Sequence, residues 1–363
     1  MKNSVRCLLA WLAFVACAAA QYREALAGYA YQFPRDHFSH PDYRTEWWYY
    51  TGNLKTADGL RFGFELTFFR QAIDRKPIEN TTWGVQDLYL AHFAVSDLSA
   101  HKFYYTERVN RAGPGIAGIS EQAGRVWNGN WQTRWVNGAQ ELQAITADFS
   151  IRLTLKSDKP PVIHGQNGVS QKGEGSGHSS HYISLTRLIT SGTIELGGQS
   201  YEVHGTSWMD HEFSTGALAP NEVGWDWLSI QLEDNTELML YRLRRKDGSA
   251  DPYSSGTYID GQGRTTHLSS RDFTMQPLND SWLSPISQAR YPIGWRVTIP
   301  QFAFDLRIHA PMQGQELAGK TRLIPSYWEG PIDISGTRAT QSIAGVGYLE
   351  MTGYDRPLEF SHP

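Results

Sequence analysis

The feature that most restricts the fold of this chain is a repeated alternation of apolar and polar residues over short runs. Residues 60–70 show it most clearly, because Phe62, Phe64, Leu66 and Phe68 alternate there with Arg61, Gly63, Glu65 and Thr67. A period of two with one apolar face is typical of a half-buried β-strand. Similar runs recur at residues 45–53, 88–98, 142–156, 181–189, 192–196, 201–205, 224–232, 237–245, 254–259, 293–299, 302–310 and 344–352.

Turn-forming residues separate these runs. Gly59 ends a loop between the first two runs, and Gly197-Gly198 predict a tight turn before residues 201–205. Many short strands divided by glycine, asparagine, aspartate and proline indicate an antiparallel sandwich or barrel. The 363 residues suffice for two domains, and 40% hydrophobic residues supply a core. We therefore expect an all-β fold with a domain boundary near residues 213–220, where small residues and proline interrupt the pattern.

The N-terminus has the pattern of an export signal. Lys2 and Arg6 precede an apolar run that ends at Cys17, and three alanines follow it. This order predicts a signal peptide over residues 1–20 and a periplasmic or secreted protein. Lipoprotein processing, with a lipid anchor at Cys17, is the alternative. Both cysteines of the chain lie in this segment, so a mature chain that begins after it would have no disulfide and no thiol nucleophile.

Charge and missing motifs exclude several functions. With Lys+Arg 33 against Asp+Glu 37, the chain has no excess of positive charge for nucleic acid. It contains no Gly-x-Ser-x-Gly elbow. His211-Glu212 lacks the second histidine of a zinc-protease helix, since Thr215 stands in its place. His178 and His181 could bind a metal, but solvated loop histidines are commoner, so we expect no metal and no cofactor.

Two segments concentrate unusual residues. At residues 46–50, alternation places Glu46 and Trp48 on one strand face. A carboxylate among aromatic residues is either paired and hydrogen-bonded or has a raised pKa. The alternative is an ordinary aromatic strand with a glutamate at its edge. At residues 205–214, Asp210, His211 and Glu212 are adjacent and bracketed by aromatic residues. Three such neighbours either exchange protons near neutral pH or form a structural junction between two domains.

The chain resembles the AttH/CrtC group of lipocalin-like proteins, which includes carotenoid 1,2-hydratases and proteins labelled as secreted hydrolases. The resemblance is carried by residues 40–52 (HPDYRTEWWYYTG), 91–94 (AHFA), 182–188 (YISLTRL), 207–213 (SWMDHEF) and 224–232 (GWDWLSIQL). It implies two consecutive lipocalin-like antiparallel β-barrels of the calycin type, over residues 21–213 and 214–363. A barrel of this size can hold one small apolar ligand.

The resemblance also implies a chemistry. A hydratase protonates an isolated double bond and adds water to the resulting cation, which needs an acid and aromatic faces. The chain departs from the hydratases at Phe213, where they tend to have tryptophan, and it lacks the aspartate expected two residues after Tyr241. The expected catalytic residues are Asp210, His211 and Glu212. The expected ligand-binding residues are Glu46, Trp48, His92, Trp208, Trp225, Trp227 and Tyr241.

Three hypotheses for the function follow. The first is an exported binder of a hydrophobic lipid, terpenoid or polyketide-like molecule, with at most weak catalysis. The second is a hydro-lyase or hydrolase that acts on an isoprenoid-like substrate through acid–base chemistry at Asp210 and His211. The third is an accessory protein of an ABC-type export permease, because relatives that resemble AttH are often encoded beside such permeases.

Overall fold

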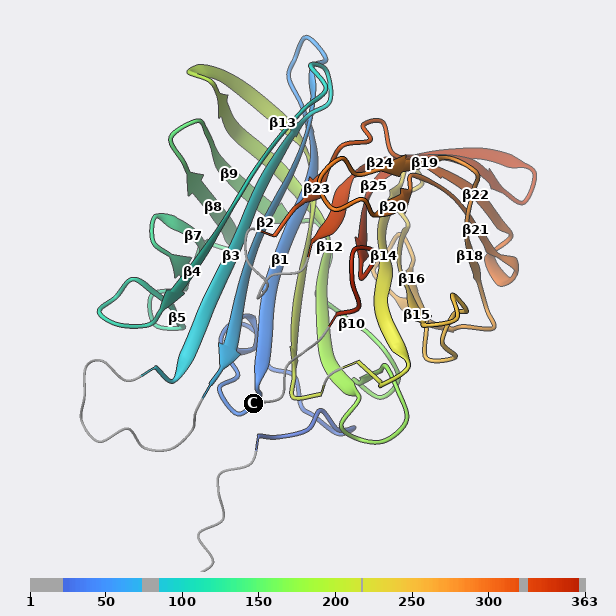
Figure 1. The fold of residues 1–363 in the computed structure, drawn as a ribbon, viewed down its shortest axis with the longest axis horizontal. Coiled ribbons are helices and arrows are strands. Elements are labelled where there is room, and N and C mark those ends of the chain that lie inside the picture. The colour runs from blue at the N-terminus through green and yellow to red at the C-terminus, as the bar shows by residue number, and fades with distance from the viewer. Residues whose placement is uncertain (1–21, 74–84, 217, 320–325, 359–363) are drawn as a thin grey trace, which may run out of the picture.

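The computed structural model describes residues 22–73, 85–216, 218–319 and 326–358, which form two antiparallel sheets packed against each other (Figure 1). Helical structure in these residues is limited to two 3-10 turns, Arg35–His37 and Pro300–Phe302. The predicted all-β class is therefore confirmed. None of the described helical segments has the length and hydropathy that a membrane crossing requires. The predicted signal peptide and Cys17 lie outside the described residues.

The first sheet curls into a nearly closed barrel. Its strand order is β4-β3-β2-β1-β13-β12-β9-β8-β7-β6-β5, with β10 and β11 paired to β12. The end strands β4 and β5 come into contact, so the two edges of the sheet approach each other. The strands are β1 (Thr45–Lys55), β2 (Arg61–Ala72), β3 (Asp87–Asp97), β4 (Lys102–Arg111), β5 (Ala117–Ser120), β6 (Arg125–Asn128), β7 (Trp131–Val136), β8 (Ala139–Ile145), β9 (Phe149–Ser157), β10 (Val162–Ile163), β11 (Ser170–Gln171), β12 (Ser179–Leu196) and β13 (Gln199–Ser214).

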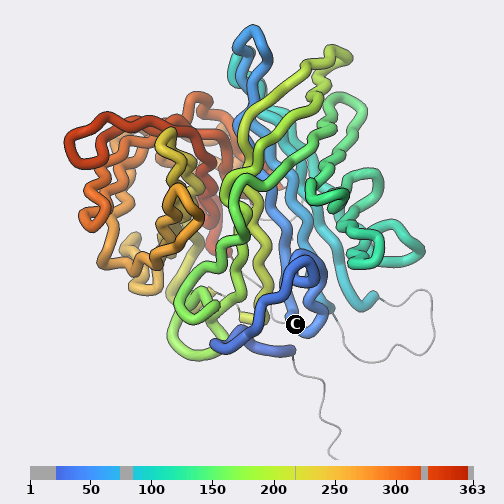
Figure 2. The backbone as a smooth tube through the Cα atoms, turned by 180° about the vertical axis from the view of Figure 1, so that it is seen from behind, coloured from blue at the N-terminus to red at the C-terminus, as the bar shows by residue number. Residues whose placement is uncertain are grey.

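The second sheet curls as a half-barrel beside the first (Figure 2). Its order is β17-β16-β15-β14-β25-β24-β22-β21-β18, and β23 pairs with β24. The strands are β14 (Glu222–Leu232), β15 (Glu237–Arg245), β16 (Ser255–Ile259), β17 (Thr265–Ser269), β18 (Thr274–Pro277), β21 (Gly294–Ile299), β22 (Phe304–His309), β23 (Glu316–Leu317), β24 (Tyr327–Arg338) and β25 (Gln341–Thr352). A separate small ribbon consists of β19 (Ser281–Leu283) and β20 (Arg290–Pro292).

Strand alternation sends one set of apolar side chains into the interior of each sheet. Trp48, Phe64 and Trp131 are fully buried inside the first barrel. Leu240 and Trp295 are fully buried inside the second sheet. The large aromatic side chains of the first barrel occupy space in which a barrel of this type would hold a ligand.

The opposite faces of the central strands are also buried, which differs from the predicted half-buried strands. The face of β2 that carries Glu65 and Thr67 lies against the second sheet, where β2 contacts β24. We call this contact between the two sheets the sheet interface. Its apolar part consists of Tyr49, Val162, Tyr182, Trp208, Trp227, Met239, Tyr241, Leu243, Ile259 and Tyr348.

Strand lengths differ from the prediction in three places. The run at 201–205 is part of the longer strand β13, which continues to Ser214. The runs at 181–189 and 192–196 form the single strand β12, with an irregularity between Leu185 and Leu188. The run at 142–156 is divided into β8 and β9, because the chain turns where Thr146 bonds back to Phe149.

Candidate functional site

Adjacent residues of β13 face opposite sides of the first sheet. Trp208 belongs to the sheet interface, whereas Met209 belongs to the interior of the first barrel. His211 lies on the interior side, where its ring stacks on that of Trp48 at 4.6 Å. Asp210 lies on the interface side, so the predicted trio of Asp210, His211 and Glu212 does not form one cluster. The physical reason is the period of two along a strand.

On the interior side, Glu46 is the centre of a buried ion-pair cluster. Its Oε1 lies 2.7 Å from His40 Nδ1 and 2.9 Å from His211 Nε2, and its Oε2 accepts a hydrogen bond from Arg70 Nε at 3.1 Å. Burial would raise the pKa of Glu46, but hydrogen bonds from His211 and His40 hold it well below its ordinary value. Asp36 contacts both histidines from the other side. The cluster therefore fastens the segment around Asp36 and His40 to the barrel.

The ligand atoms of His40, Glu46 and His211 lie within 4.8 Å of one another, a spacing that could hold a metal ion. Each of these atoms already has a protein partner, and the guanidinium of Arg70 lies beside the carboxylate. A metal cation would have to displace these hydrogen bonds and would face a positive neighbour. The three residues therefore fit an ion-pair cluster better than a metal centre.

Asp210 accepts hydrogen bonds from three side chains at the sheet interface. Its carboxylate accepts hydrogen bonds from the Tyr182 hydroxyl at 2.5 Å, from the Trp208 indole at 2.6 Å and from Ser184. Trp227 of the second sheet donates to the Tyr182 oxygen at 2.9 Å, so a chain of hydrogen bonds crosses the interface. Burial raises the pKa of Asp210 to about 7, and the three donors only partly oppose it. Asp210 can therefore give or take a proton near neutral pH.

Glu212 pairs with Lys172, which lies at a partly exposed edge of the sheet interface. The Lys172 ammonium forms an ion pair with the Glu212 carboxylate, and the lysine side chain is 22% exposed. The same ammonium lies 5.7 Å from the ring centroids of Trp47 and Tyr241 and 5.6 Å from that of Tyr182. These distances allow cation–π attraction. Lys172 thus places a positive charge beside an aromatic wall.

Three glutamates join this interface from facing strands: Glu65 of β2, Glu329 of β24 and Glu350 of β25. Glu329 is opposite Glu350 in the β24–β25 ladder, and it accepts a hydrogen bond from Tyr49 of β1 at 2.8 Å. One oxygen of Glu65 and one of Glu329 have no hydrogen-bond partner within the described ranges. Burial is the largest cause that raises the pKa of these three glutamates, and repulsion between carboxylates adds to it. The pKa rises to about 8 for Glu65, to about 7 for Glu350, and well above its ordinary value for Glu329.

His92 of β3 brings a neutral imidazole to the same interface. Its Nδ1 lies 2.5 Å from the Tyr327 hydroxyl of the second sheet. Burial lowers the pKa of His92 to about 4, so the ring is uncharged at neutral pH. Its Nε2 has no hydrogen-bond partner among the residues that the structure describes. His92 therefore keeps one ring nitrogen unpaired among the described residues of the interface.

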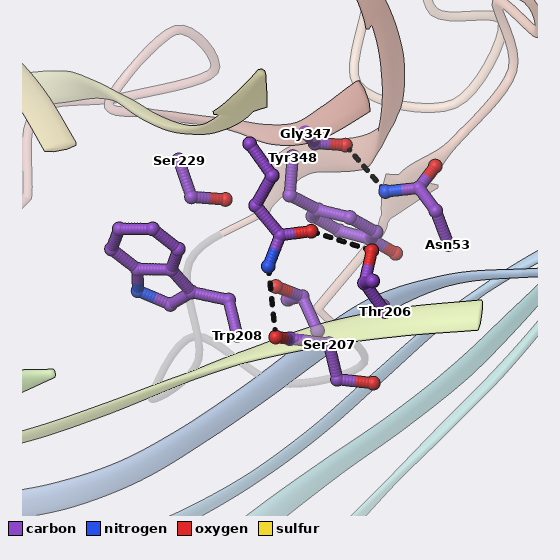
Figure 3. Close-up of a pocket in the computed structure, with 10 residues that line it drawn as sticks. Asn53, Thr206, Ser207, Trp208, Ser229, Gly347 and Tyr348 are labelled. Atoms are coloured by element: carbon purple, nitrogen blue, oxygen red, sulfur yellow. Dashed lines mark hydrogen bonds between the residues drawn. The ribbon is translucent and has the colours of Figure 1, made fainter. Parts of the chain in front are cut away.

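A small cavity lies between Trp208 and Tyr348, as Figure 3 shows. Its volume of about 10 Å³ is room for about one water molecule. The Gln231 amide nitrogen donates to the Ser207 carbonyl at 3.0 Å, and its oxygen accepts from Thr206 at 2.6 Å. These hydrogen bonds hold this part of the interface together.

The structure therefore separates the predicted site residues into two groups. Asp210, Glu212, His92, Trp208, Trp225, Trp227 and Tyr241 lie at the sheet interface. Glu46, Trp48 and His211 lie on the barrel-interior side. Sequence reasoning missed Tyr182, Lys172, Glu65, Glu329 and Glu350. The signal for the three glutamates is that each directly follows a large apolar or aromatic residue, Phe64, Trp328 or Leu349, within its strand.

Comparison with known proteins agrees with this architecture. Residues 24–354 match the AttH-like family. The crystal structure described as an AttH (NE1406) from Nitrosomonas europaea has a TM-score of 0.82 and 34% identity, covering 92% of this chain and 99% of that one. Kievitone hydratase from Nectria haematococca shares the fold, with a TM-score of 0.68, 16% identity and 92% and 97% of the two chains covered.

A curated relative, dehydratase asqC from Emericella nidulans, is 21% identical over 281 residues, which are 74% of this chain and 77% of the relative. The relatives of this lipocalin-like fold thus include a hydratase and a dehydratase. The match over nearly all of the described residues, together with the identity to the Nitrosomonas protein, shows that the chain belongs to the AttH-like family.

Proposed function

We propose that this protein is an enzyme that adds water to, or removes water from, a hydrophobic molecule of isoprenoid or polyketide type. The observation that carries the proposal is the buried carboxyl group of Asp210, whose pKa is raised to about 7 beside the aromatic rings of Trp208 and Trp227. An acid with this pKa is partly protonated at neutral pH and is therefore suited to general acid–base catalysis. The dehydratase and hydratase among its relatives support the same reaction class.

In the proposed elimination, protonated Asp210 gives its proton to the hydroxyl oxygen of the substrate. The carbon–oxygen bond breaks, and water leaves with both electrons of that bond. The carboxylate of Glu350 then takes a proton from the neighbouring carbon, and the electrons of the carbon–hydrogen bond form the double bond. The pKa of Glu350 is also raised to about 7, so the two carboxyl groups can hold opposite protonation states. Hydration is the same sequence in reverse.

Aromatic rings supply the rest of the proposed site. The faces of Trp225, Trp227 and Tyr241 belong to the interface cluster and can stabilise positive charge that develops on carbon. Trp47, Trp225, Glu350 and Lys172 are each only partly buried, so we place substrate entry at the edge that they form. The cavity beside Trp208 has room for about one water molecule, so this edge has to open for a larger substrate to reach Asp210. Tyr182 holds Asp210 in position through the hydrogen bond described above.

Binding of a hydrophobic molecule without turnover is the second candidate. It is supported by the lipocalin-like fold and by the same aromatic rings, which would serve a binder equally well. Action in the periplasm or outside the cell, and contact with an ABC-type permease, stay proposals that rest on the N-terminal pattern and on the resemblance.

The test is a screen for water exchange. The full chain is incubated in ¹⁸O-labelled water with tertiary and allylic alcohols and the matching alkenes, beginning with linalool and myrcene, and the products are followed by mass spectrometry. Turnover with label incorporation supports the enzyme, and Asp210→Asn should lower it by about 10²–10⁴-fold.

The control is Asp305→Asn, because Asp305 of β22 forms a half-exposed ion pair with Arg296 of β21 in the second sheet. Saturable binding of a compound that is never converted would favour the binder. Equal turnover by Asp210→Asn and the wild type would contradict the assignment of Asp210.

A further inference from the structure

A second cavity lies on the far side of β15 from the sheet interface. Along this strand, Tyr241 and Leu243 point to the interface, whereas Leu240 points into the interior of the second sheet. Arg242 shares the face of Leu240 by strand alternation and lines the cavity. The cavity volume is about 270 Å³, close to the lower end of the range for small-molecule sites of about 300–1,000 Å³.

The walls of this cavity are apolar at depth and polar at the rim. Phe273 and Met275 are buried and belong to the core of the second sheet. Thr274 and Gln276 alternate with them along the chain and are exposed. This pattern is typical of a site that takes an apolar chain and keeps a polar opening. The complete lining is Arg242, Ala250, Ser254, Ser270, Phe273, Thr274, Met275, Gln276 and Pro277.

Positive charge is in excess in the group that Arg242 forms with Arg244 and Asp226. Asp226 is fully buried and receives hydrogen bonds from Arg244 and from the Tyr354 hydroxyl, the latter at 2.9 Å. The Arg242 guanidinium lies 3.5 Å from the other oxygen of the same carboxylate. Two guanidinium groups therefore share one carboxylate, which leaves one positive charge unmatched in this group.

Arg242 also retains unused hydrogen-bonding capacity. Its guanidinium has five N–H groups, and among the described residues it donates one hydrogen bond, to the Gly248 carbonyl at 2.9 Å. Its side chain is 17% exposed, so it is neither free in solvent nor fully enclosed. A mostly buried guanidinium gains most from an anionic partner, and its planar fork matches a carboxylate.

We propose that this cavity is a binding site for a small amphipathic carboxylate, such as a medium-chain fatty acid. The carboxylate pairs with Arg242, and the alkyl chain lies on Phe273 and Met275. A monoanion matches the single excess charge, whereas a phosphate dianion would exceed it. The site is separate from the proposed acid–base site, because Arg242 and Tyr241 lie on opposite faces of β15.

The test is calorimetric titration of the full chain with sodium octanoate. We expect one saturable site in the wild type and an affinity that falls by about tenfold or more in Arg242→Gln, because a hydrogen-bonded charge pair is lost. Octan-1-ol should bind more weakly to the wild type and should not distinguish Arg242→Gln from it. Arg296→Gln is the matched control, since Arg296 pairs with Asp305 on the surface.

A second variant keeps the test decisive if Arg242→Gln fails to fold. Met275→Trp fills the cavity and should abolish octanoate binding while Arg242 stays in place. Asp210→Asn should bind octanoate as the wild type does, so failure of the acid–base proposal would leave this result unchanged. The absence of saturable octanoate binding in the wild type, or unaltered affinity in both Arg242→Gln and Met275→Trp, would overturn the proposal.

Discussion

Asp210 and His211 are joined by one peptide bond, yet they belong to two different buried networks. Asp210 accepts a hydrogen bond from Tyr182 at the sheet interface, whereas His211 lies 2.9 Å from Glu46 on the interior side of the barrel. The surroundings in the two networks shift the pKa of the acid in opposite directions. Burial raises the pKa of Asp210 to about 7, whereas charged partners hold the pKa of Glu46 well below its ordinary value. The interface acid is therefore suited to proton transfer, and the interior acid to holding the fold together.

Removing the Tyr182 hydroxyl should move the pH dependence of the proposed reaction upward. That hydroxyl stabilises the charged form of Asp210, so Tyr182→Phe should raise the pKa of Asp210 above about 7. A general acid loses activity when it ionises, so the alkaline limb of the pH–rate profile should shift to higher pH. The variant also leaves the Trp227 N–H without its acceptor, which should cost about 1–3 kcal/mol of stability.

Tyr50→Phe is the control for this prediction. The Tyr50 hydroxyl donates to Gln140 at 2.7 Å inside the first barrel, away from Asp210. This variant should lose stability without any shift of the pH–rate profile. Titration of the Asp210 carbonyl band, by infrared difference against Asp210→Asn, reports the same pKa without a substrate. An unmoved pKa in Tyr182→Phe would contradict the assigned hydrogen bond.

The interface glutamates should make the protein less stable as the pH rises. The pKa of Glu65 is raised from 4.5 to about 8 by burial, so the folded chain keeps a proton that the unfolded chain releases. This contribution to stability is fully present below about pH 4.5 and is lost as the pH rises through about 8. Glu65→Gln should therefore flatten the fall in unfolding free energy over this window.

Urea unfolding at several pH values between about 5 and 8 measures this slope. Glu195→Gln is the control, because Glu195 forms a half-exposed pair with Arg152 on the first sheet. That variant should keep the wild-type slope. A slope that is equal in Glu65→Gln and the wild type would mean that Glu65 is ionised in the folded protein.

More of the fold than of the candidate site could be predicted from the sequence. Alternation determines which residues share a strand face, and in the structure Trp227 faces the interface while its neighbour Asp226 faces the interior of the second sheet. The same rule, applied to residues 210–212, separates His211 from its two acidic neighbours. Alternation within one strand therefore held even where the adjacent acidic residues suggested a single cluster.

The interface itself could not be predicted, because it depends on how two sheets pack. The polar face of β2 reads as a solvent face in the sequence, and only the second sheet over it buries Glu65. Glu329 and Tyr49 are 280 residues apart and share a hydrogen bond that no local pattern contains. The acids found from the sequence stand in a conspicuous motif, whereas Glu65, Glu329 and Glu350 stand in separate strands with no acidic residue next to them in the chain.

Glu46→Gln should destabilise the protein strongly. Glu46 is fully buried and holds Arg70 and two histidines, so removing its charge leaves the Arg70 guanidinium with one fewer buried partner. Breaking a buried ion pair in this way costs about 3–5 kcal/mol. Asp305→Asn, in a surface pair with Arg296, should cost at most about 1 kcal/mol. A change in ligand affinity with little change in unfolding free energy would instead assign Glu46 to a binding site.

Gly63→Ala should weaken the contact between the two sheets. A Cβ at Gly63 would lie 2.6 Å from Cγ and 2.8 Å from Cδ of Pro331 on β24, closer than carbon atoms pack. The proline ring is rigid, so the sheets would have to move apart, and overpacking of this kind costs about 1–3 kcal/mol. Gly261→Ala is the control, because its nearest neighbour would be the Asn235 carbonyl oxygen at 3.7 Å.

Thermal unfolding of both variants measures the cost. If the interface forms the proposed active site, Gly63→Ala should also lower turnover at temperatures where the protein stays folded, since the acids from facing strands would no longer meet at their native spacing. If Gly63→Ala is as stable as the wild type, the two sheets can move apart there without loss of stability. That result would contradict the tight packing of Gly63 against Pro331.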